Sequence, residues 1–252
     1  MATTTILGID VGASGTKGAI IDISNGKLLT ERLRLPTPKS GKPNDMAETF
    51  AELVKLLEWK GPIGCGFPAI VKDGVAFSAA NIHKDWIGTN ISKLFSKATK
   101  QDVYVLNDAD AAGLAEVSFG DPKASKGVTL VITIGSGLGS ALFVDGKLVP
   151  NTEFGHLYLK GQKKVAEAYA SSGARKREDL EYDEWGKRLN EFLLHTDRLL
   201  SPNHIILGGG ISRKFNQFKD QLTSPTPILP AVFENRAGAI GAAMFAKQQV
   251  SK

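Results

Sequence analysis

Short apolar runs alternate with amphipathic segments along the chain, and the two patterns predict strands and helices in turn. Apolar runs bounded by Gly, Asn, Asp or Ser predict strands at residues 5–10, 16–23, 27–35, 63–67, 74–78, 103–107, 128–134, 140–144, 147–150 and 204–207. Apolar residues at helical spacing predict helices at 47–59, 91–97, 109–117, 182–200 and 236–248. Asp45 is the expected N-cap of the first helix, and residues 37–44, which are rich in Pro, Lys and Gly, are expected to form a loop.

The pattern also indicates an internal duplication. The strands that begin near residue 5 and those that begin at residue 128 form two similar triplets, and the leading strand of each ends in a turn rich in Gly and Ser or Thr. A strand follows each of these turns, so neither is the turn of a βαβ unit. We therefore expect two related α/β halves.

Composition narrows the class of protein. The chain has 252 residues, 42% of them apolar and 23% charged, which is typical of a globular protein of one or two domains. A single cysteine, Cys65, excludes an internal disulfide and a four-cysteine zinc site. The apolar stretches are too short to cross a membrane, and the N-terminus does not resemble a secretory signal, so we expect a soluble, cytoplasmic protein. A net charge of +5 is compatible with an anionic partner but does not identify one.

Three glycine-rich turns are candidates for phosphate binding, because closely approached backbone N–H groups can bind an anion. They are neither a Walker A loop nor a dinucleotide fingerprint. The third lies between a strand and an expected helix, whose N-terminus would favour an anion. Their candidate ligands are Asp10, Gly12, Ser14, Gly15, Thr16 and Lys17 in the first turn, Thr133, Gly135, Ser136, Gly137 and Gly139 in the second, and Gly208, Gly209 and Gly210 in the third.

Together the three turns resemble the phosphate-1, phosphate-2 and adenosine turns of the superfamily of sugar kinases, actin and heat-shock ATPases. Further segments resemble the ROK sugar kinases: Asn107-Asp108-Ala109, then Glu153-Phe154-Gly155-His156, then residues 167–171. The cysteine cluster that most ROK proteins place before that last segment is absent, so no structural zinc is expected. This departure, with residues 78–88, 106–116 and 149–156, resembles the polyphosphate glucokinases of the family, and the resemblance extends from residue 6 to 246.

The resemblance implies an actin-like (ribonuclease H-like) sugar kinase fold with two α/β domains around a cleft. The smaller would contain residues 1–107 and the terminal helix, 236–252, and the larger residues 108–235. The implied reaction is phosphorylation of glucose to glucose 6-phosphate with inorganic polyphosphate, with ATP as a second candidate donor. Mg²⁺ is the implied cofactor, held by Asp10 through water. A homodimer is also implied, with the helix at 182–200 as a candidate interface, and neither nucleic acid nor membrane is an expected partner.

Asp108 is the candidate catalytic base, because phosphoryl transfer to a sugar requires a carboxylate that accepts the hydroxyl proton. The alternative is that Asp108 only caps the following helix, and Asp110 is a competing carboxylate. Carboxylates and imidazole suit sugar hydroxyls, so Asn81, Asn107, Asp108, Glu153, His156 and Glu167 are the candidate glucose ligands.

Clustered basic residues suggest a track for a long polyanion. They are Lys160, Lys163, Lys164, Arg175, Lys176 and Arg177, with Lys17, Lys84 and Arg213 as secondary candidates for the track. The alternative is a solvated basic loop. Three rival functions stay open: a strictly ATP-dependent ROK glucokinase, a non-catalytic ROK sugar-binding regulator and an actin-like assembly protein. A repressor would need a DNA-reading domain, for which we expect no room before the first strand.

Overall fold

The computed structural model describes residues 4–80 and 82–251 and divides the chain into two compact units. The first unit consists of Met1–Ala115 and Arg236–Lys252, and the second of Glu116–Asn235. The division falls eight residues after the expected one, because the start of helix α3 (Asp108–Phe119) packs within the first unit. A β-carbon built on Gly66 would lie 3.3 Å from Cβ of Ala111, and one built on Gly241 only 1.7 Å from its carbonyl oxygen.

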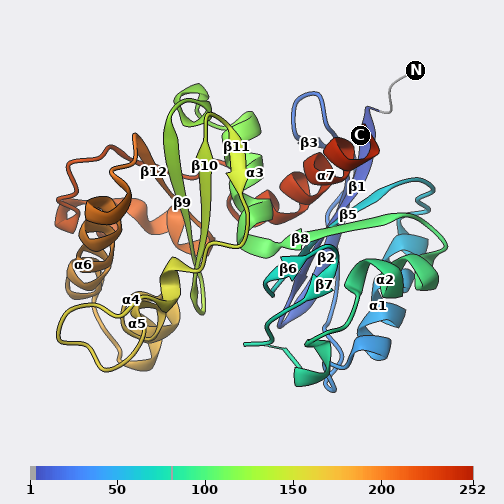
Figure 1. Cartoon of the computed structure of the whole chain (residues 1–252), viewed down its shortest axis with the longest axis horizontal. Helices are drawn as coiled ribbons and strands as arrows, with labels where there is room; N and C mark the ends of the chain where they lie inside the picture. The colour runs from blue at the N-terminus through green and yellow to red at the C-terminus, as the bar shows by residue number, and fades with distance from the viewer. Residues whose placement is uncertain (1–3, 81, 252) are drawn as a thin grey trace. The chain divides into compact units, whose positions relative to one another are not determined.

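A six-stranded sheet in the order β3-β2-β1-β5-β8 forms the centre of the first unit, and β4 also pairs with β2 (Figure 1). β1 and β2 form an antiparallel hairpin, while β5 and β8 run parallel to β1. The expected strand at 27–35 is two short strands, which both pair with β2. The strands of this unit are β1 (Thr5–Gly12), β2 (Gly15–Asp22), β3 (Lys27–Leu28), β4 (Leu33–Leu35), β5 (Ile63–Phe67), the hairpin β6 (Val71–Lys72) and β7 (Val75–Ala76), and β8 (Val103–Asn107).

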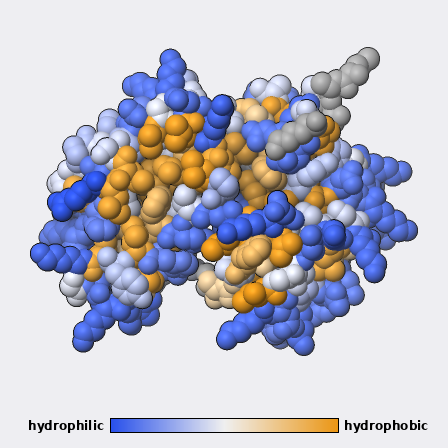
Figure 2. Space-filling model, in the orientation of Figure 1, coloured by the Kyte–Doolittle hydropathy of each residue, from blue (hydrophilic) through white to orange (hydrophobic). Residues whose placement is uncertain are grey.

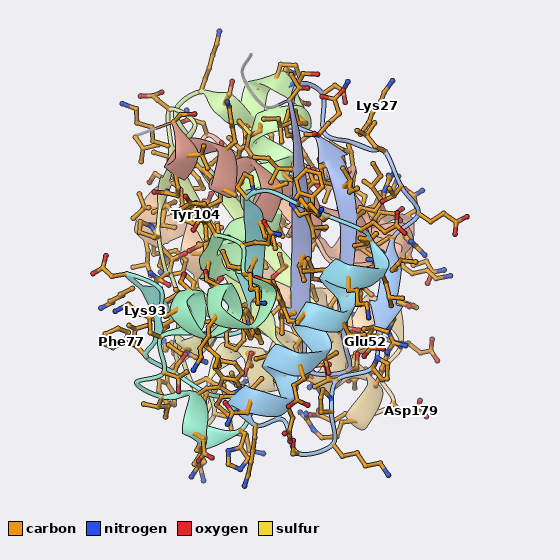
Figure 3. All side chains as sticks on the ribbon, turned by 90° about the vertical axis from the view of Figure 1, so that its right-hand side faces the viewer. Lys27, Glu52, Phe77, Lys93, Tyr104 and Asp179 are labelled. Atoms are coloured by element: carbon orange, nitrogen blue, oxygen red, sulfur yellow. The ribbon has the colours of Figure 1, made fainter. Side chains whose placement is uncertain are left out.

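Helices α1 (Pro43–Leu56) and α2 (Ile91–Thr99) bury their apolar sides in the core of the first unit, and the short 3₁₀ helix η1 (Lys84–Trp86) contributes a buried Trp86. The rings of Phe50 and Phe95 stack with centroids 4.2 Å apart. Charged residues such as Glu52 and Lys93 project from the outer sides of the helices (Figure 3). The predicted cap Asp45 is wrong: the helix begins earlier, with Lys42 as N-cap and Pro43 in the first turn, where proline's missing N–H costs no hydrogen bond.

Helix α7 (Ala237–Val250), preceded by η6 (Glu234–Arg236), lies directly on β1 and β5. Glycines in the strands permit this approach. A β-carbon on Gly8 would lie 1.9 Å from the carbonyl oxygen of Ala239, and one on Gly64 1.8 Å from that of Ala242. The end of the chain therefore covers its first strand.

The second unit contains a five-stranded sheet in the order β11-β10-β9-β12-β13. An antiparallel hairpin, a short antiparallel strand and two parallel strands again follow one another, so the duplication expected from the sequence is visible in the topology. Its elements are η2 (Pro122–Ser125), β9 (Val128–Ile134), β10 (Leu138–Val144), β11 (Lys147–Val149), η3 (Phe154–His156), α4 (Ala166–Ala170), α5 (Ser172–Arg177), α6 (Tyr182–Leu200), β12 (His204–Gly208), η4 (Gly210–Gln217), η5 (Lys219–Gln221) and β13 (Ile228–Pro230).

Trp185 on α6 lies in the core of the second unit, where its indole N–H donates to the carbonyl oxygens of Ala170 and Ser171. This bond ties α4 and α5 to the long helix. Among the helices of the described residues, none has both the length and the apolar character needed to cross a bilayer.

Candidate active site

The first glycine turn is a tight connection between β1 and β2, in which Gly12 and Gly15 are register partners. Neither glycine has a positive φ, so their role is close packing rather than unusual backbone geometry. A β-carbon on Gly15 would lie 2.7 Å from Nε of Arg34. Arg34 Nη2 donates to the carbonyl of Ser14 at 2.7 Å, and Thr37 Oγ1 to that of Gly12 at 2.7 Å.

These two supporting residues were missed by sequence reasoning. The signal for Arg34 was its place in the strand next to β2, where it is the register partner of Lys17.

Asp10 lies at the start of this turn, opposite Lys17 across the hairpin, with Nζ of the lysine 3.7 Å from its carboxylate. Burial raises the pKa of Asp10, and the nearby charges of Lys17 and Arg32 act in the opposite direction. The side chain of Asp10 still retains 21% of its accessible surface. Asp10 is therefore a partly desolvated carboxylate beside a positive charge.

Asn107 is the last residue of β8, the edge strand of the parallel part of the same sheet, and Asp108 follows it. Asn107 Oδ1 accepts from the backbone N–H groups of Ala109 at 2.8 Å and Asp110 at 3.0 Å, so Asn107 caps α3. Its Nδ2 donates to the carbonyl of Ala69 at 3.1 Å. Asp108 Oδ1 accepts from the N–H of Ala109 at 2.9 Å.

The two candidate carboxylates of the first unit gather around one glycine. Gly66 is the register partner of Asp10, and a β-carbon on Gly66 would lie 3.6 Å from Cα of Asp108. Asp108 is half-buried, whereas the competing Asp110 is only 1% exposed. A base must meet its substrate, so the difference in exposure favours Asp108. The candidate ligand Asn81 lies outside the described residues.

The second and third glycine turns lie side by side in the second unit. Gly208, the last residue of β12, pairs with Thr133 of β9, and Gly209 packs on the backbone of Ile134. Gly209 has φ +83°, and a β-carbon there would lie 2.5 Å from the carbonyl of Ile134, so only glycine fits. A 3₁₀ helix, η4, follows this turn in place of an α-helix.

The predicted sugar residues of the second unit border the second turn. Nδ1 of His156 lies 3.7 Å from a carboxylate oxygen of Glu153. Burial raises the pKa of Glu153, the nearby imidazole of His156 lowers it, and the carboxylate of Glu167 raises it. Glu167 accepts a hydrogen bond from the N–H of Leu138, the residue after the turn, at 3.1 Å. Glu153, His156 and Glu167 therefore form one polar cluster next to Gly135–Gly137.

The basic residues divide into two kinds. Lys160, Lys163 and Lys164 are exposed on a small hairpin that Tyr158 and Val165 close. Arg175 instead stacks on the ring of Tyr182 at 4.3 Å and donates to the carbonyl of Leu180.

Two further arginines of the second unit, one on α5 and one on η4, also have partners within that unit. Arg177 donates to the carbonyl of Ala168 and to Glu178, and Arg213 pairs with Glu234 at 2.6 Å. Lys84 and Lys176 are exposed, Lys84 in the first unit.

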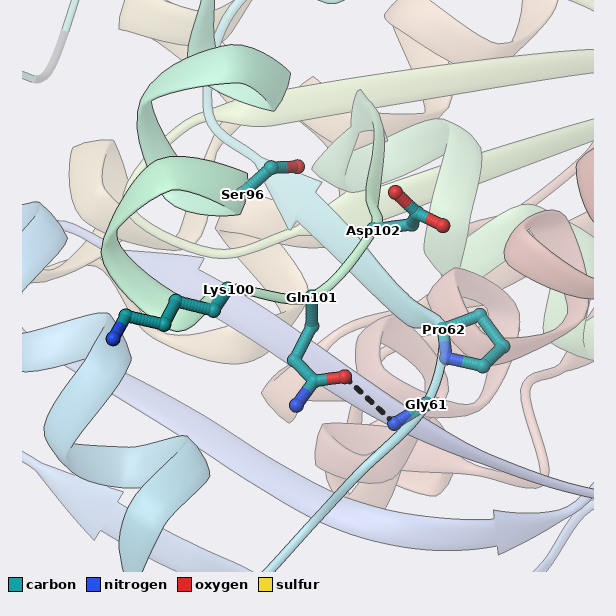
Figure 4. A pocket seen from close by; sticks show the side chains of 6 residues that line it. All are labelled: Gly61, Pro62, Ser96, Lys100, Gln101 and Asp102. Atoms are coloured by element: carbon teal, nitrogen blue, oxygen red, sulfur yellow. Dashed lines mark hydrogen bonds between the residues drawn. The ribbon is translucent and has the colours of Figure 1, made fainter.

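One pocket of the first unit contains none of the predicted residues (Figure 4). Its lining residues are Gly61, Pro62, Ser96, Lys100, Gln101 and Asp102. Gln101 Oε1 accepts from the N–H of Gly61 at 2.9 Å, which ties the turn before β5 to the turn before β8.

Comparison with known proteins places these features in a family. The model of the ROK family matches residues 6–176. Polyphosphate glucokinase of Mycobacterium tuberculosis (strain CDC 1551 / Oshkosh) is 44% identical over 238 residues, which are 94% of this chain and 89% of that protein. The corresponding protein of Mycobacterium leprae is 41% identical over 97% of this chain and 75% of its own length. The crystal structure of the inorganic polyphosphate/ATP-glucomannokinase of Arthrobacter sp. strain KM superposes with a TM-score of 0.93 at 44% identity, covering 98% of this chain and 100% of that one.

Proposed function

Since the chain belongs to the ROK family, with the family's actin-like sugar kinase fold, we propose that it is a phosphotransferase that converts glucose to glucose 6-phosphate with inorganic polyphosphate as phosphoryl donor. The observation that carries the proposal is the 44% identity to a polyphosphate glucokinase over 94% of the chain. Further support comes from Asn107 at the end of β8 and from Gly155 and Glu167, which both contact Leu138 after the second glycine turn.

Asp108 is the proposed general base. Its carboxylate takes the proton of the sugar hydroxyl as that oxygen bonds to the terminal phosphorus, while the bond from phosphorus to the bridging oxygen breaks and the shortened polyphosphate leaves. Asn107 Oδ1 accepts the hydrogen bonds that cap the N-terminus of α3, so the carboxylate of Asp108 is not required as the helix cap. The carboxylates of Glu153 and Glu167 accept hydrogen bonds from sugar hydroxyls, and the imidazole of His156 can donate or accept one. Asn107 Nδ2 has two N–H groups: one donates to the carbonyl of Ala69, and the other contributes a hydrogen bond to the sugar.

The first and second glycine turns bind the donor phosphates, with Lys17 neutralising part of their charge. Asp10 fits a hydrated Mg²⁺: it is a partly exposed carboxylate, and among the described residues no group of three ligating side chains forms a complete protein cage. Mg²⁺ commonly binds through one carboxylate, waters and substrate phosphates. The ion would neutralise charge on the transferring phosphoryl group.

Lys160, Lys163 and Lys164 are the proposed contacts for the outer part of a long polyphosphate. Their hairpin presents three exposed ammonium groups, which suit a repeating polyanion. Arg175 and Arg177 are better assigned to holding α5 in place, since both donate to backbone carbonyls. Lys176 is exposed and stays a candidate for the track, and Lys84 remains a secondary candidate.

We also propose a homodimer, because closed two-fold assemblies are the commonest oligomers. Leu194 and Leu199 are exposed on α6, and Val144 and Val149 are exposed at the ends of β10 and β11. Figure 2 shows apolar surface over the strands of the second unit. Either surface could be covered by a second copy, and the molar mass in solution tests the proposal.

The test of the proposed reaction is the initial rate of glucose 6-phosphate formation with Mg²⁺ and either polyphosphate or ATP at matched phosphate concentration. A higher kcat/KM with polyphosphate is expected, and removing Mg²⁺ with a chelator should abolish both rates. Turnover with ATP alone would support the strictly ATP-dependent alternative. Glucose binding without turnover with either donor would support the regulator.

A further inference from the structure

Glu167 contacts the second glycine turn itself. The backbone N–H of Leu138, the first residue after that turn, donates to Oε2 of Glu167 at 3.1 Å. A β-carbon on Gly137 would lie 2.2 Å from the same oxygen. The carboxylate therefore rests against the backbone of the turn, in a space that only a glycine at position 137 leaves open.

Two other segments of the second unit, around Gly155 and Gly173, also contact this turn. A β-carbon on Gly155 would lie 2.1 Å from the carbonyl oxygen of Leu138, so the segment that carries Glu153 and His156 touches the residue that Glu167 binds. The N–H of Gly173 donates to the carbonyl of Gly135 at 3.1 Å. The turn is thus held on several sides, and only Glu167 holds it by a charged side chain in the described hydrogen bonds.

The second oxygen of Glu167 has a different environment. Within residues 4–80 and 82–251, Oε1 accepts no hydrogen bond from the chain. Glu153 is close enough for the charge of Glu167 to disfavour its ionisation. One oxygen therefore binds the backbone of the turn, and the other keeps its hydrogen-bonding capacity for a ligand.

We propose that Glu167 is a positioning residue for the phosphate donor as well as a sugar ligand, because its Oε2 fixes the amide of Leu138 and so the shape of the donor turn. The inference rests on the proposed function, in which that turn binds polyphosphate. Since the sugar and the turn share one carboxylate, each ligand orders the group that the other needs. The two bindings are therefore coupled, and each ligand raises the affinity for the other by the same factor.

The test is the Kd of inorganic polyphosphate measured without glucose. Glu167→Ala removes the acceptor, and we expect the Kd to rise about tenfold, as for the loss of one charge-assisted hydrogen bond. Glu167→Gln keeps an oxygen that can accept from Leu138 and removes the negative charge, so its Kd should stay near that of the unaltered protein or fall below it. Removal of the negative charge alone would tighten polyanion binding, so the charge effect and the positioning effect have opposite signs.

Glu153→Ala is the matched control. It removes a neighbouring carboxylate that does not contact Leu138, and it should raise the KM for glucose while leaving the polyphosphate Kd without glucose unchanged or lower. In addition, glucose should lower the polyphosphate Kd of the unaltered protein, and this effect should disappear in Glu167→Ala.

A double-mutant cycle separates positioning from general loss of structure. Gly137→Ala should push the carboxylate off Leu138 and raise the same Kd, but it should have little further effect in the Glu167→Ala background. Unfolding midpoints are recorded alongside, and Gly137→Ala gives an independent reading where Glu167→Ala does not fold. An unchanged Kd in Glu167→Ala, or additive effects in the cycle, would overturn the inference. Failure of the unaltered protein to phosphorylate glucose with polyphosphate would instead overturn the proposed function.

Discussion

Gly238 lies directly against the side chain of Asp10. A β-carbon on Gly238, at the start of α7, would lie 3.0 Å from Cγ of Asp10 and 3.1 Å from Oδ1. This is closer than ordinary packing, so the carboxylate has its position because the helix offers no side chain there.

Gly238→Ala should therefore displace Asp10 by a few tenths of an ångström and lower kcat/KM for the donor by about tenfold, since small misplacements of catalytic groups are costly. Alanine is the better helix former, so the unfolding midpoint should not fall with activity. The matched control is Gly241→Ala on the same helix, whose β-carbon would lie 1.7 Å from the carbonyl of Ala111 and should cost stability instead. Equal losses of stability in both variants would contradict this explanation.

Asp108→Asn retains the shape of the side chain and removes the proton acceptor. The expected result is a fall in kcat of about 10² to 10⁴ with glucose affinity largely kept. Asp110→Asn is the comparison, because Asp110 is buried at 1% exposure and its change should lower stability more than kcat. Steady-state kinetics and thermal unfolding of both variants check the prediction. Near-normal turnover of Asp108→Asn would move the role to Asp110.

Gly64→Ala should destabilise the first unit by at least about 2 kcal/mol, because its β-carbon has no space in a packed interior. The obstruction is backbone, the carbonyl oxygen of Ala242 at 1.8 Å, and it cannot rotate away. Gly18→Ala is a milder control, since its nearest neighbours are side-chain carbons of Ile9 and Leu53 at 3.1 and 3.2 Å. Urea denaturation measures both, and a smaller loss in Gly64→Ala than in Gly18→Ala would show that α7 can shift.

Replacing Lys160, Lys163 and Lys164 together with Gln should raise the KM for long polyphosphate and flatten its dependence on salt, because fewer counterions are released on binding. The KM for the neutral sugar should change much less. Three exposed lysines in and just after α2 provide a control with the same change of charge: Lys93, Lys97 and the C-cap Lys100. If both triple variants alter the salt dependence equally, the effect is one of net charge and the hairpin is a solvated loop.

Arg175→Gln should behave differently from the lysine changes. It removes the stacking on Tyr182 and the bond to the carbonyl of Leu180, so the expected loss is in stability. A fall in the unfolding midpoint with an unchanged salt dependence of KM distinguishes this outcome from a role in the polyanion track.

The pKa of Glu153 lies above its ordinary value of 4.5, chiefly because of burial. The folded protein therefore binds more protons than the unfolded chain in the window just above 4.5, and stability should fall as pH rises through it. Glu153→Gln should remove that part of the pH dependence. Glucose binding to the ionised carboxylate should weaken as pH falls through the same window. Unfolding and glucose titrations between about pH 4 and 7 test both signs, and a variant with the slope of the unaltered protein would assign the titration to another group.

Most of the strand and helix order could be predicted from the sequence, because burial in alternating strands and helices leaves a clear apolar pattern. The N-terminus of α1 could not, since Pro43 and Asp45 are both acceptable at a helix start and only the observed backbone distinguishes them. The split of the 27–35 strand depended on pairing with β2, which is a long-range property.

For the site, the sequence motifs indicate which residues are candidates, but they do not indicate the hydrogen-bond partners of those residues. Asn107 is expected to contact sugar, and the structure adds that its two polar atoms also bind Ala69 and the start of α3. Arg175 and Arg177 appeared equivalent to the neighbouring lysines in sequence, yet each donates to a backbone carbonyl. A charge pattern records which residues are basic, and only the fold determines which of them have partners.

The packing of α7 on β1 has a consequence for biosynthesis. The second unit is one continuous segment, whereas the first unit is completed only by residues 236–252, which are synthesised after the second unit. Since domains generally fold as units, we expect the second unit to be able to fold before the first. Until then Gly8 and Gly64 present an uncovered apolar sheet face to the cell. Nascent chains stalled before residue 236 should therefore bind chaperones through their earliest strands, even though those strands were synthesised first.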